Sequence, residues 1–252
     1  MLSKVVTECE ASANFVNAAI ATHGDAIGRG LEAKLDGERQ AGEPPVPNGK
    51  WQVTLAGRRM MRLLAALLVA DAAHEAELLD DAGPRKERDE AVAQLYKKAL
   101  AFRQGTAWMY GPEAERALGF DGSTPDEPRT LLRVCKLALD QFDDALAGRA
   151  ARAGFTWIPA DEKAALAASV AQTEAALRAV DTERKEAEAT LVAKYAAQAA
   201  YTQAFQEVAG LVALLLDMAG EHDLAAKVRP SKRRAGRVTS EEERLLDADP
   251  VT

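Results

Sequence analysis

The chain has 252 residues and a formal net charge of −7 at pH 7, with 48% hydrophobic and 28% charged residues. This length allows one or two domains, and the share of apolar residues supplies a sizeable core. The acidic balance argues against a general nucleic-acid-binding protein, whose surface is usually basic. Aromatic residues are scarce, and no segment alternates polar and apolar residues between turn signals, so the sequence predicts an all-α fold.

The cysteines and the N-terminal segment bear on where the protein functions. Cys9 and Cys135 lie far apart, each on an apolar helical stripe, which predicts free thiols and fits a reducing compartment. The first residues lack the continuous apolar region of a secretory signal. The longest apolar runs, 63–70 and 208–216, are shorter than the ~20 residues of a membrane helix. We therefore expect a cytoplasmic protein without a transmembrane segment, and its abundant alanine points to a bacterial source.

Apolar residues at helical spacing predict the first helix over residues 2–23. Three glycines between residues 24 and 30 weaken the pattern, so we expect the helix to fray there and to resume to about Leu35. A phosphate-binding loop is the alternative, but no strand precedes these glycines and no Gly-Lys-Ser/Thr follows them. Residues 36–50 contain three prolines and are expected to form an extended connector.

Two helices are predicted after the connector. The second helix, residues 53–81, has the widest apolar face in the chain, which indicates a central position in a bundle. The pair Gly83-Pro84 ends it. The third helix covers residues 86–109, with Gly105 as a candidate kink.

The fourth helix has a strong start signal. Thr124 is the expected N-cap, and Glu127 completes a capping box. Pro128 offers an alternative start, because proline fits the first position of a helix. The apolar positions of this helix continue to Leu146, and residues 148–158 connect it to the next helix.

The chain is organised around residues 160–219, which follow Pro159 and precede Gly220. Most of the residues at alternating spacings of three and four from Leu166 to Leu215 are apolar, which is the pattern of a heptad seam. The candidate break is the polar stretch around Asp181. It contains no glycine, proline or capping box, so we expect one continuous helix.

These elements predict an elongated antiparallel bundle of about five main helices, with one very long C-terminal helix of coiled-coil character. Residues 1–229 form a single helical domain in this interpretation, with residues 160–219 as its spine. The segment after Pro230 has a basic block followed by an acidic block and few apolar residues, so residues 230–252 are expected to be a disordered charged tail.

The basic cluster before the acidic block is a weak candidate for binding anions. It offers limited contact with nucleic acid, an acidic partner or anionic lipid. The acidic residues directly behind it compete for the same cations, which favours a solvated tail. The basic residues concerned are Lys232, Arg233, Arg234 and Arg237.

Asp71 and His74 are the candidates for a metal site. They lie three residues apart on the apolar side of the second helix, and an inward carboxylate-x-x-His pair is half of a ferritin-like di-metal site. The full site needs a second such pair, and neither His23 nor His222 has an acidic residue three positions before it. The alternative to a metal site is that Asp71 and His74 lie near the end of the helix, where they bond to each other or face solvent.

The irregular segment from Trp108 to Thr124 concentrates aromatic residues. Trp108, Tyr110 and Phe120 fall there, and aromatic residues on loops often anchor a partner. The alternative is that these rings close the end of the bundle.

The sequence contains no nucleotide-binding, nucleophile-elbow or zinc-ligand motif, so we expect neither an enzyme nor a cofactor. We expect a structural protein that functions through protein–protein interaction or self-assembly, with self-association along residues 166–215 as a hypothesis. Packing within the chain is the other explanation of this seam. A membrane-active helical protein and a metal-binding bundle are the alternative functions. The candidate interaction residues are Val170, Leu177, Leu191, Tyr201, Phe205, Trp108, Tyr110 and Phe120.

Overall fold

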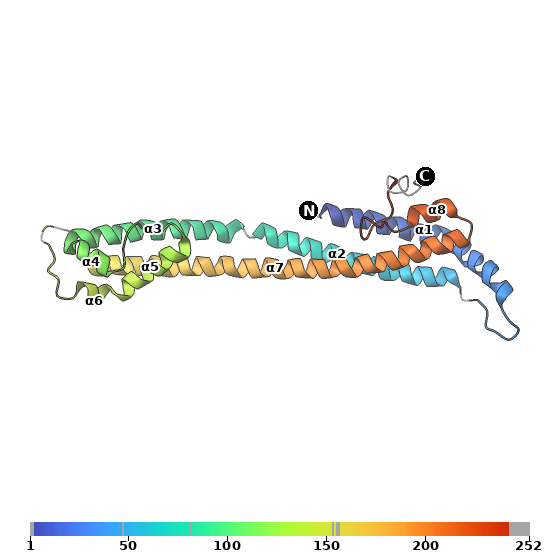
Figure 1. Cartoon of the computed structure of the whole chain (residues 1–252), viewed down its shortest axis with the longest axis horizontal. Coiled ribbons are helices and arrows are strands. Elements are labelled where there is room, and N and C mark those ends of the chain that lie inside the picture. The colour runs from blue at the N-terminus through green and yellow to red at the C-terminus, as the bar shows by residue number, and fades with distance from the viewer. Residues whose placement is uncertain (1–2, 47, 81, 153, 155–156, 242–252) are drawn as a thin grey trace, which may run out of the picture. The chain divides into compact units, whose positions relative to one another are not determined.

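A computed structural model describes residues 3–46, 48–80, 82–152, 154 and 157–241. Regular structure in these residues is helical and includes no β-strand, which confirms the all-α fold. The elements are α1 (Lys4–Leu35), the short 3-10 helix η1 (Asp36–Glu38), α2 (Gly49–Asp80), α3 (Ala82–Tyr110), α4 (Pro112–Ala117), α5 (Pro128–Asp140), α6 (Phe142–Leu146), α7 (Pro159–Met218) and α8 (His222–Val228), labelled in Figure 1.

The long C-terminal helix is present as predicted. α7 is unbroken over 60 residues and passes through Asp181 without interruption. The sequence predicts one domain over residues 1–229, whereas the chain divides into two compact units. Unit 1 comprises residues 1–76 and 188–252, and unit 2 comprises residues 77–187. α7 therefore contributes its first half to unit 2 and its second half to unit 1.

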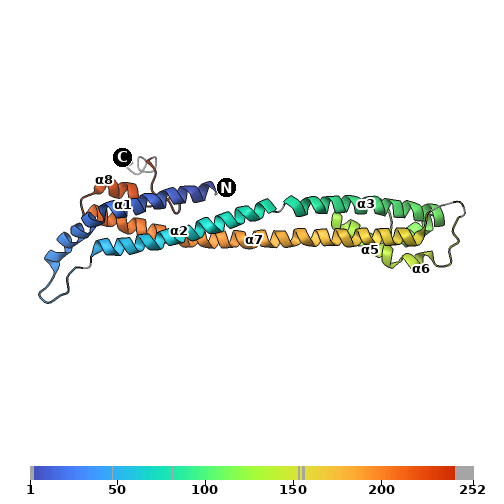
Figure 2. The same ribbon diagram turned by 180° about the vertical axis from the view of Figure 1, so that it is seen from behind.

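In unit 1, α1 and α2 pack against the second half of α7. α1 runs parallel to α7, because Ser3 lies near Lys194 around a shared aspartate, and Cys9 lies against Tyr201. α2 runs antiparallel to α7, since His74 contacts Thr190 near one end of this segment and Arg59 contacts Glu207 near the other. α8 lies beside α1 in both Figure 1 and Figure 2.

The glycines at residues 24–30 neither break α1 nor fray it. α1 continues to Leu35, and these residues lie where other segments approach closely. A Cβ atom at Gly30 would lie 2.7 Å from the Cα of Ala219, and one at Gly24 would lie 3.2 Å from the Lys50 side chain. Glycine is used here because any larger residue at position 30 would push α1 away from the end of α7.

In unit 2, α3 and α5 pack against the first half of α7 (Figure 1). α5 is antiparallel to α7, since Arg129 pairs with Asp181 at one end and Lys136 pairs with Glu174 further along. The core is aromatic: the ring of Phe102 lies 5.6 Å from that of Phe142 and 6.0 Å from that of Trp157. Gly105 leaves room for this tryptophan, because a Cβ atom there would lie 2.2 Å from the indole nitrogen.

α5 begins with Pro128, so the alternative start is confirmed and the capping box at Thr124 is wrong. The Glu127 side chain accepts hydrogen bonds from the backbone N–H groups of Arg129 (3.0 Å) and Thr130 (2.6 Å). Proline has no N–H to donate and has its φ fixed, so it moves the cap to the residue before it. The bonds from Thr130 and Arg129 also lower the pKa of the Glu127 carboxyl.

The segment after α8 departs from the predicted disorder as far as residue 240. Residues 229–240 form a loop closed by an antiparallel bridge between Pro230 and Val238. The Tyr201 hydroxyl lies 3.0 Å from the Gly236 carbonyl oxygen, and Arg237 pairs with Glu8. Few apolar residues are needed here, because backbone bonds and the buried tyrosine hold the loop. Residues 242–252 lie outside the described residues.

Candidate functional site

Asp71 is the centre of a buried charged cluster in unit 1. Its side chain has no exposed surface, and its carboxylate accepts hydrogen bonds from the backbone N–H of Ser3 (2.8 Å) and the Ser3 hydroxyl (3.0 Å). The Lys194 ammonium lies 2.7 Å from the same carboxylate and is only 14% exposed. Burial by itself raises the pKa of Asp71, but the bonds from Lys194 and Ser3 outweigh it and lower this pKa. The carboxylate is therefore held in its charged form.

His74 is also buried, but it has a separate partner. Its Nδ1 lies 3.0 Å from the hydroxyl oxygen of Thr190 on α7. The predicted pair thus faces the core as expected, and each member contacts α7. A metal ion at Asp71 would have to displace the Lys194 ammonium, so this geometry favours a structural role, and metal binding stays a prediction. Lys194 is the residue from which the sequence could have predicted this ion pair, because a lysine on the buried side of a helix needs an acidic partner nearby.

Three glutamates in unit 2 come close together. Carboxylate oxygens of Glu77, Glu183 and Glu186 all lie within 4.8 Å of one another, and the buried Oε1 of Glu77 has no hydrogen-bond partner among the described residues. Glu186 is exposed and Glu183 is half-buried. The cluster offers carboxylate oxygens to a cation, but acidic groups also gather in this way without a metal ion, so it is not by itself a metal site.

The predicted interaction residues on the seam lie mostly inside the protein. Val170 is buried in the core of unit 2, and Tyr201 and Phe205 are buried in the core of unit 1. Leu177 and Leu191 are half-buried. The seam of residues 166–215 therefore packs within the chain at both ends, and self-association along it stays a prediction.

The aromatic residues between positions 108 and 124 divide into two groups. Phe120 is buried, with its ring 6.3 Å from that of Phe102, and the half-buried Tyr110 lies edge-on to Trp157 at 6.5 Å. These two rings fill the end of unit 2, as the alternative interpretation predicts. Trp108 alone is exposed, at 59%.

A neutral face runs along the second half of α7. It consists of five exposed residues spaced three or four apart, of which the last four line an open groove of about 480 Å³: Val192, Tyr195, Ala199, Gln203 and Gln206. Val192 is 62% exposed and Tyr195 is 59% exposed. Between residues 189 and 206 the one charged side chain is Lys194, which points inward to Asp71. We call this surface the neutral face of α7.

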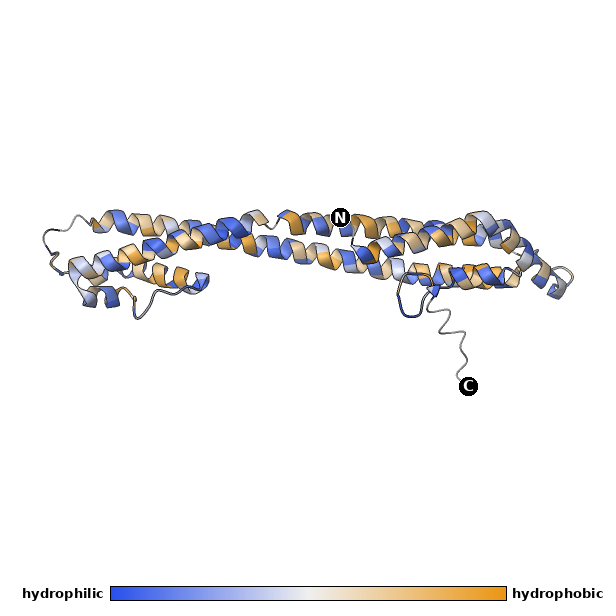
Figure 3. Ribbon diagram, turned by 90° about the horizontal axis from the view of Figure 1, so that it is seen from above, coloured by the Kyte–Doolittle hydropathy of each residue, from blue (hydrophilic) through white to orange (hydrophobic). Residues whose placement is uncertain are grey.

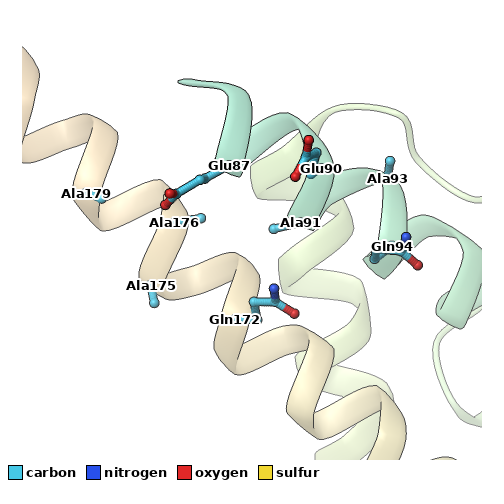
Figure 4. Close-up of a pocket in the computed structure, with 9 residues that line it drawn as sticks. All are labelled: Glu87, Glu90, Ala91, Ala93, Gln94, Gln172, Ala175, Ala176 and Ala179. Atoms are coloured by element: carbon cyan, nitrogen blue, oxygen red, sulfur yellow. The ribbon is translucent and has the colours of Figure 1, made fainter. Parts of the chain in front are cut away.

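A second groove lies between α3 and α7 in unit 2 (Figure 4). Its volume is about 650 Å³. Buried or half-buried alanines from both helices form its floor, and exposed residues form its rim. The floor residues are Ala91, Ala176 and Ala179, and the rim residues are Glu87, Glu90, Ala93, Gln94, Gln172 and Ala175. We call this surface the α3/α7 groove.

α7 also bears on the membrane alternative. Within the described residues, it is the one helix that is long and apolar enough to cross a membrane, but half of its most apolar stretch is buried inside the protein. Figure 3 shows polar and apolar residues mixed along the long helices. A buried core helix meets the same criteria of length and composition, so these criteria do not distinguish a membrane-spanning helix from a core helix.

The basic cluster is divided by the loop that contains it. Lys232 and Arg233 are exposed, whereas Arg237 turns inward to Glu8. The Ser231 hydroxyl accepts hydrogen bonds from the backbone N–H groups of Arg233 (3.2 Å) and Arg234 (2.8 Å), which fixes the turn. Fewer cations face solvent than the sequence indicates, and contact with nucleic acid stays a prediction.

Comparison with known proteins supplies no relative. No protein-family model, no curated protein and no solved structure matches the chain.

Proposed function

We propose that this chain is a non-enzymatic helical-bundle protein that functions by self-association through the neutral face of α7. The observation that carries the proposal is the exposure of Val192 and Tyr195 on a helix face without an exposed charge. Large apolar side chains on such a face gain free energy when a second surface removes them from water.

The charge of the chain restricts where a second copy can dock. Each copy carries a net charge of −7, so two copies repel each other over most orientations. The neutral face avoids this repulsion, because Glu188 precedes it, Glu207 follows it, and Lys194 is neutralised by Asp71. Two neutral faces can therefore meet at the lowest electrostatic cost.

The residues of this face suit helix–helix packing. Their spacing of three and four residues places them along one stripe, as in a coiled coil. Tyr195 is a projecting side chain, while Ala199 leaves a shallow position about one turn away. Around a two-fold axis near Ala199, the two alanines would lie opposite each other and Tyr195 of each copy would lie opposite Gln203 of the other, so one surface supplies both halves of the contact.

Sedimentation velocity of the full chain over a range of concentrations tests this proposal. We expect a concentration-dependent dimer, and we expect Tyr195→Glu to shift it to monomer, because the new carboxylate would be buried without a partner. Leu79→Glu is the matched control, since Leu79 is 77% exposed but lies in unit 2. A chain that stays monomeric at every concentration, or a dimer that survives Tyr195→Glu, would contradict the proposal.

A further inference from the structure

We propose a second interaction site, the α3/α7 groove, whose partner is an amphipathic helix of a different protein that carries lysine or arginine beside its apolar stripe. The groove has the geometry of a helix-binding site. Glu87, Glu90 and Gln94 follow one another at spacings of three and four on α3, and Gln172, Ala175 and Ala179 do so on α7. Two such stripes side by side form the holes into which the side chains of a third helix insert.

The floor of the groove determines which side chains fit. Alanines from both helices line it, so the two backbones carry little side-chain bulk at this point (Figure 4). A volume of about 650 Å³ is therefore left for large apolar residues supplied by the partner. The register of the two helices is supported beside the groove, because the buried Thr173 hydroxyl shares its one proton between the carbonyl oxygens of Ser169 (2.9 Å) and Ala91 (3.2 Å).

The rim of the groove determines the charge of the partner. Glu87 and Glu90 are exposed on the α3 side, and the opposite side is neutral. Glu90 contacts Lys86 only at 3.9 Å, at the surface. A partner with acidic flanks would be repelled by both glutamates, whereas lysine or arginine at the flanking positions would pair with them.

α5 shows that α7 already holds a helix by this chemistry. At about 100° per residue, Glu174, Leu177 and Asp181 face the side of α7 opposite the groove. α5 lies on that side, with Arg129 paired to Asp181 and Lys136 paired to Glu174 at 2.8 Å. Between these pairs, α5 buries Leu131 and Cys135. A basic-flanked amphipathic helix is thus the kind of element that this stretch of α7 binds.

The basic segments nearest to this description in the chain are not suitable occupants. The basic residues Arg129 and Lys136 of α5 are already paired, and residues 229–237 form a loop rather than a helix. The sequence of residues 242–252 contains more acidic than basic residues, which does not complement the glutamate rim. The occupant is therefore assigned to another protein.

Binding of two synthetic helical peptides to the full chain tests this inference. One peptide carries leucine at a and d, lysine at e and g, and alanine elsewhere, and the other replaces each lysine with glutamate. Like charges at e and g keep each peptide from pairing with itself. By fluorescence anisotropy, we expect saturable binding of the lysine peptide and roughly tenfold weaker binding of the glutamate peptide.

Matched variants locate the binding. Glu87→Lys/Glu90→Lys should weaken binding of the lysine peptide roughly tenfold. The control Asp140→Lys/Glu188→Lys makes the same change in net charge at exposed positions elsewhere, and it should change this affinity less than about twofold. Ala175→Trp should abolish binding by filling the groove without changing charge, while Ala189→Trp, at another exposed alanine of α7, should not. Circular dichroism of each variant checks that it is folded.

The contradicting outcomes are equally specific. Equal binding of both peptides, or equal weakening by the two charge-reversed double variants, would show attraction to the acidic protein as a whole and would overturn the assignment. A change in sedimentation of the peptide-free protein on Ala175→Trp would show that the groove covers a second copy of the chain, and this too would overturn it. The groove variants at residues 87, 90 and 175 lie outside the neutral face, so its test stands separately.

Discussion

The two units stabilise their interiors by different means. Unit 1 has a largely aliphatic core that also contains a charged carboxylate, Asp71, and its ammonium partner, Lys194. Unit 2 has an aromatic core around Phe102. A buried ion pair allows one arrangement of its helices and penalises others, whereas packed rings stabilise through area and shape. The difference shows that a similar three-helix packing can be fixed by charge in one unit and by shape in the other.

Each unit contains one buried cysteine that can report on it separately. Cys9 lies in the core of unit 1, and Cys135 lies in the core of unit 2. Burial raises the pKa of both thiols, that of Cys135 to about 12. Both should therefore react slowly with an alkylating reagent until their own unit opens.

The largest effect is expected from Lys194→Met, which leaves the Asp71 carboxylate buried without its counter-charge. Loss of one partner of a buried pair costs about 3–5 kcal/mol, so we expect this decrease in the unfolding free energy of unit 1. Urea unfolding combined with iodoacetamide labelling measures it, with Cys9 labelled faster and Cys135 unchanged. The control is the double variant Asp71→Leu/Lys194→Met, which should recover much of the loss; no recovery would mean that the lysine acts through packing alone.

The same cluster predicts an acid-dependent loss of stability in unit 1. Because the pKa of Asp71 is lower in the folded protein than its ordinary value of 3.8, the ionised carboxylate stabilises the fold above that value. This contribution should disappear as the pH falls through the folded pKa. The urea midpoints of the natural protein and of Asp71→Asn should therefore converge below about pH 4. A difference between them that stays constant to lower pH would show that Asp71 is not ionised in the fold.

A smaller effect is expected in unit 2 from Phe102→Leu. The ring of Phe102 is fully buried and contacts three other aromatic residues, so its loss leaves a cavity that costs about 2 kcal/mol. Iodoacetamide should label Cys135 faster and Cys9 at an unchanged rate, which is the reverse of the result expected for Lys194→Met. Equal acceleration at both thiols would show that the units open together, and the contrast between them would be lost.

The smallest effect concerns the loop of residues 229–240. Tyr201→Phe removes the hydroxyl that bonds to the carbonyl oxygens of Cys9 (2.8 Å) and Gly236, which should cost about 1 kcal/mol. We expect faster tryptic cleavage after Lys232, with little change in the urea midpoint. Tyr195→Phe, the same loss of a hydroxyl at an exposed tyrosine of α7, is the control. Unchanged cleavage would place the attachment of the loop in the Arg237–Glu8 pair instead.

The long helix and the all-α class could be predicted because they depend on local spacing. Heptad spacing from Leu166 to Leu215 and the absence of glycine or proline around Asp181 were sufficient for α7. The glycines of α1 were misinterpreted, because their use depends on Ala219, which lies far away in the sequence. The loop of residues 229–240 was missed for the same reason, since Tyr201 holds it.

The candidate surfaces were harder to predict than the fold. The seam gave the buried side of α7 correctly, including Tyr201 and Phe205, but a one-helix pattern does not show whether the covering helix belongs to the same chain. The neutral face was not noticed, because Val192 and Tyr195 stand among alanines and glutamines. The α3/α7 groove requires two helices in register, and the Thr173–Ala91 bond that supports this register is invisible in the sequence.

Unit 1 is assembled from two separate stretches of the chain, and this affects how the protein emerges from a ribosome. Residues 77–187 are synthesised as one run, so unit 2 can fold as soon as that run is exposed. α1 and α2 emerge earlier, but their apolar faces must wait for residues 188–218. During that interval the N-terminal hairpin is the part of the nascent chain most open to chaperones or to mispairing with a neighbouring nascent chain.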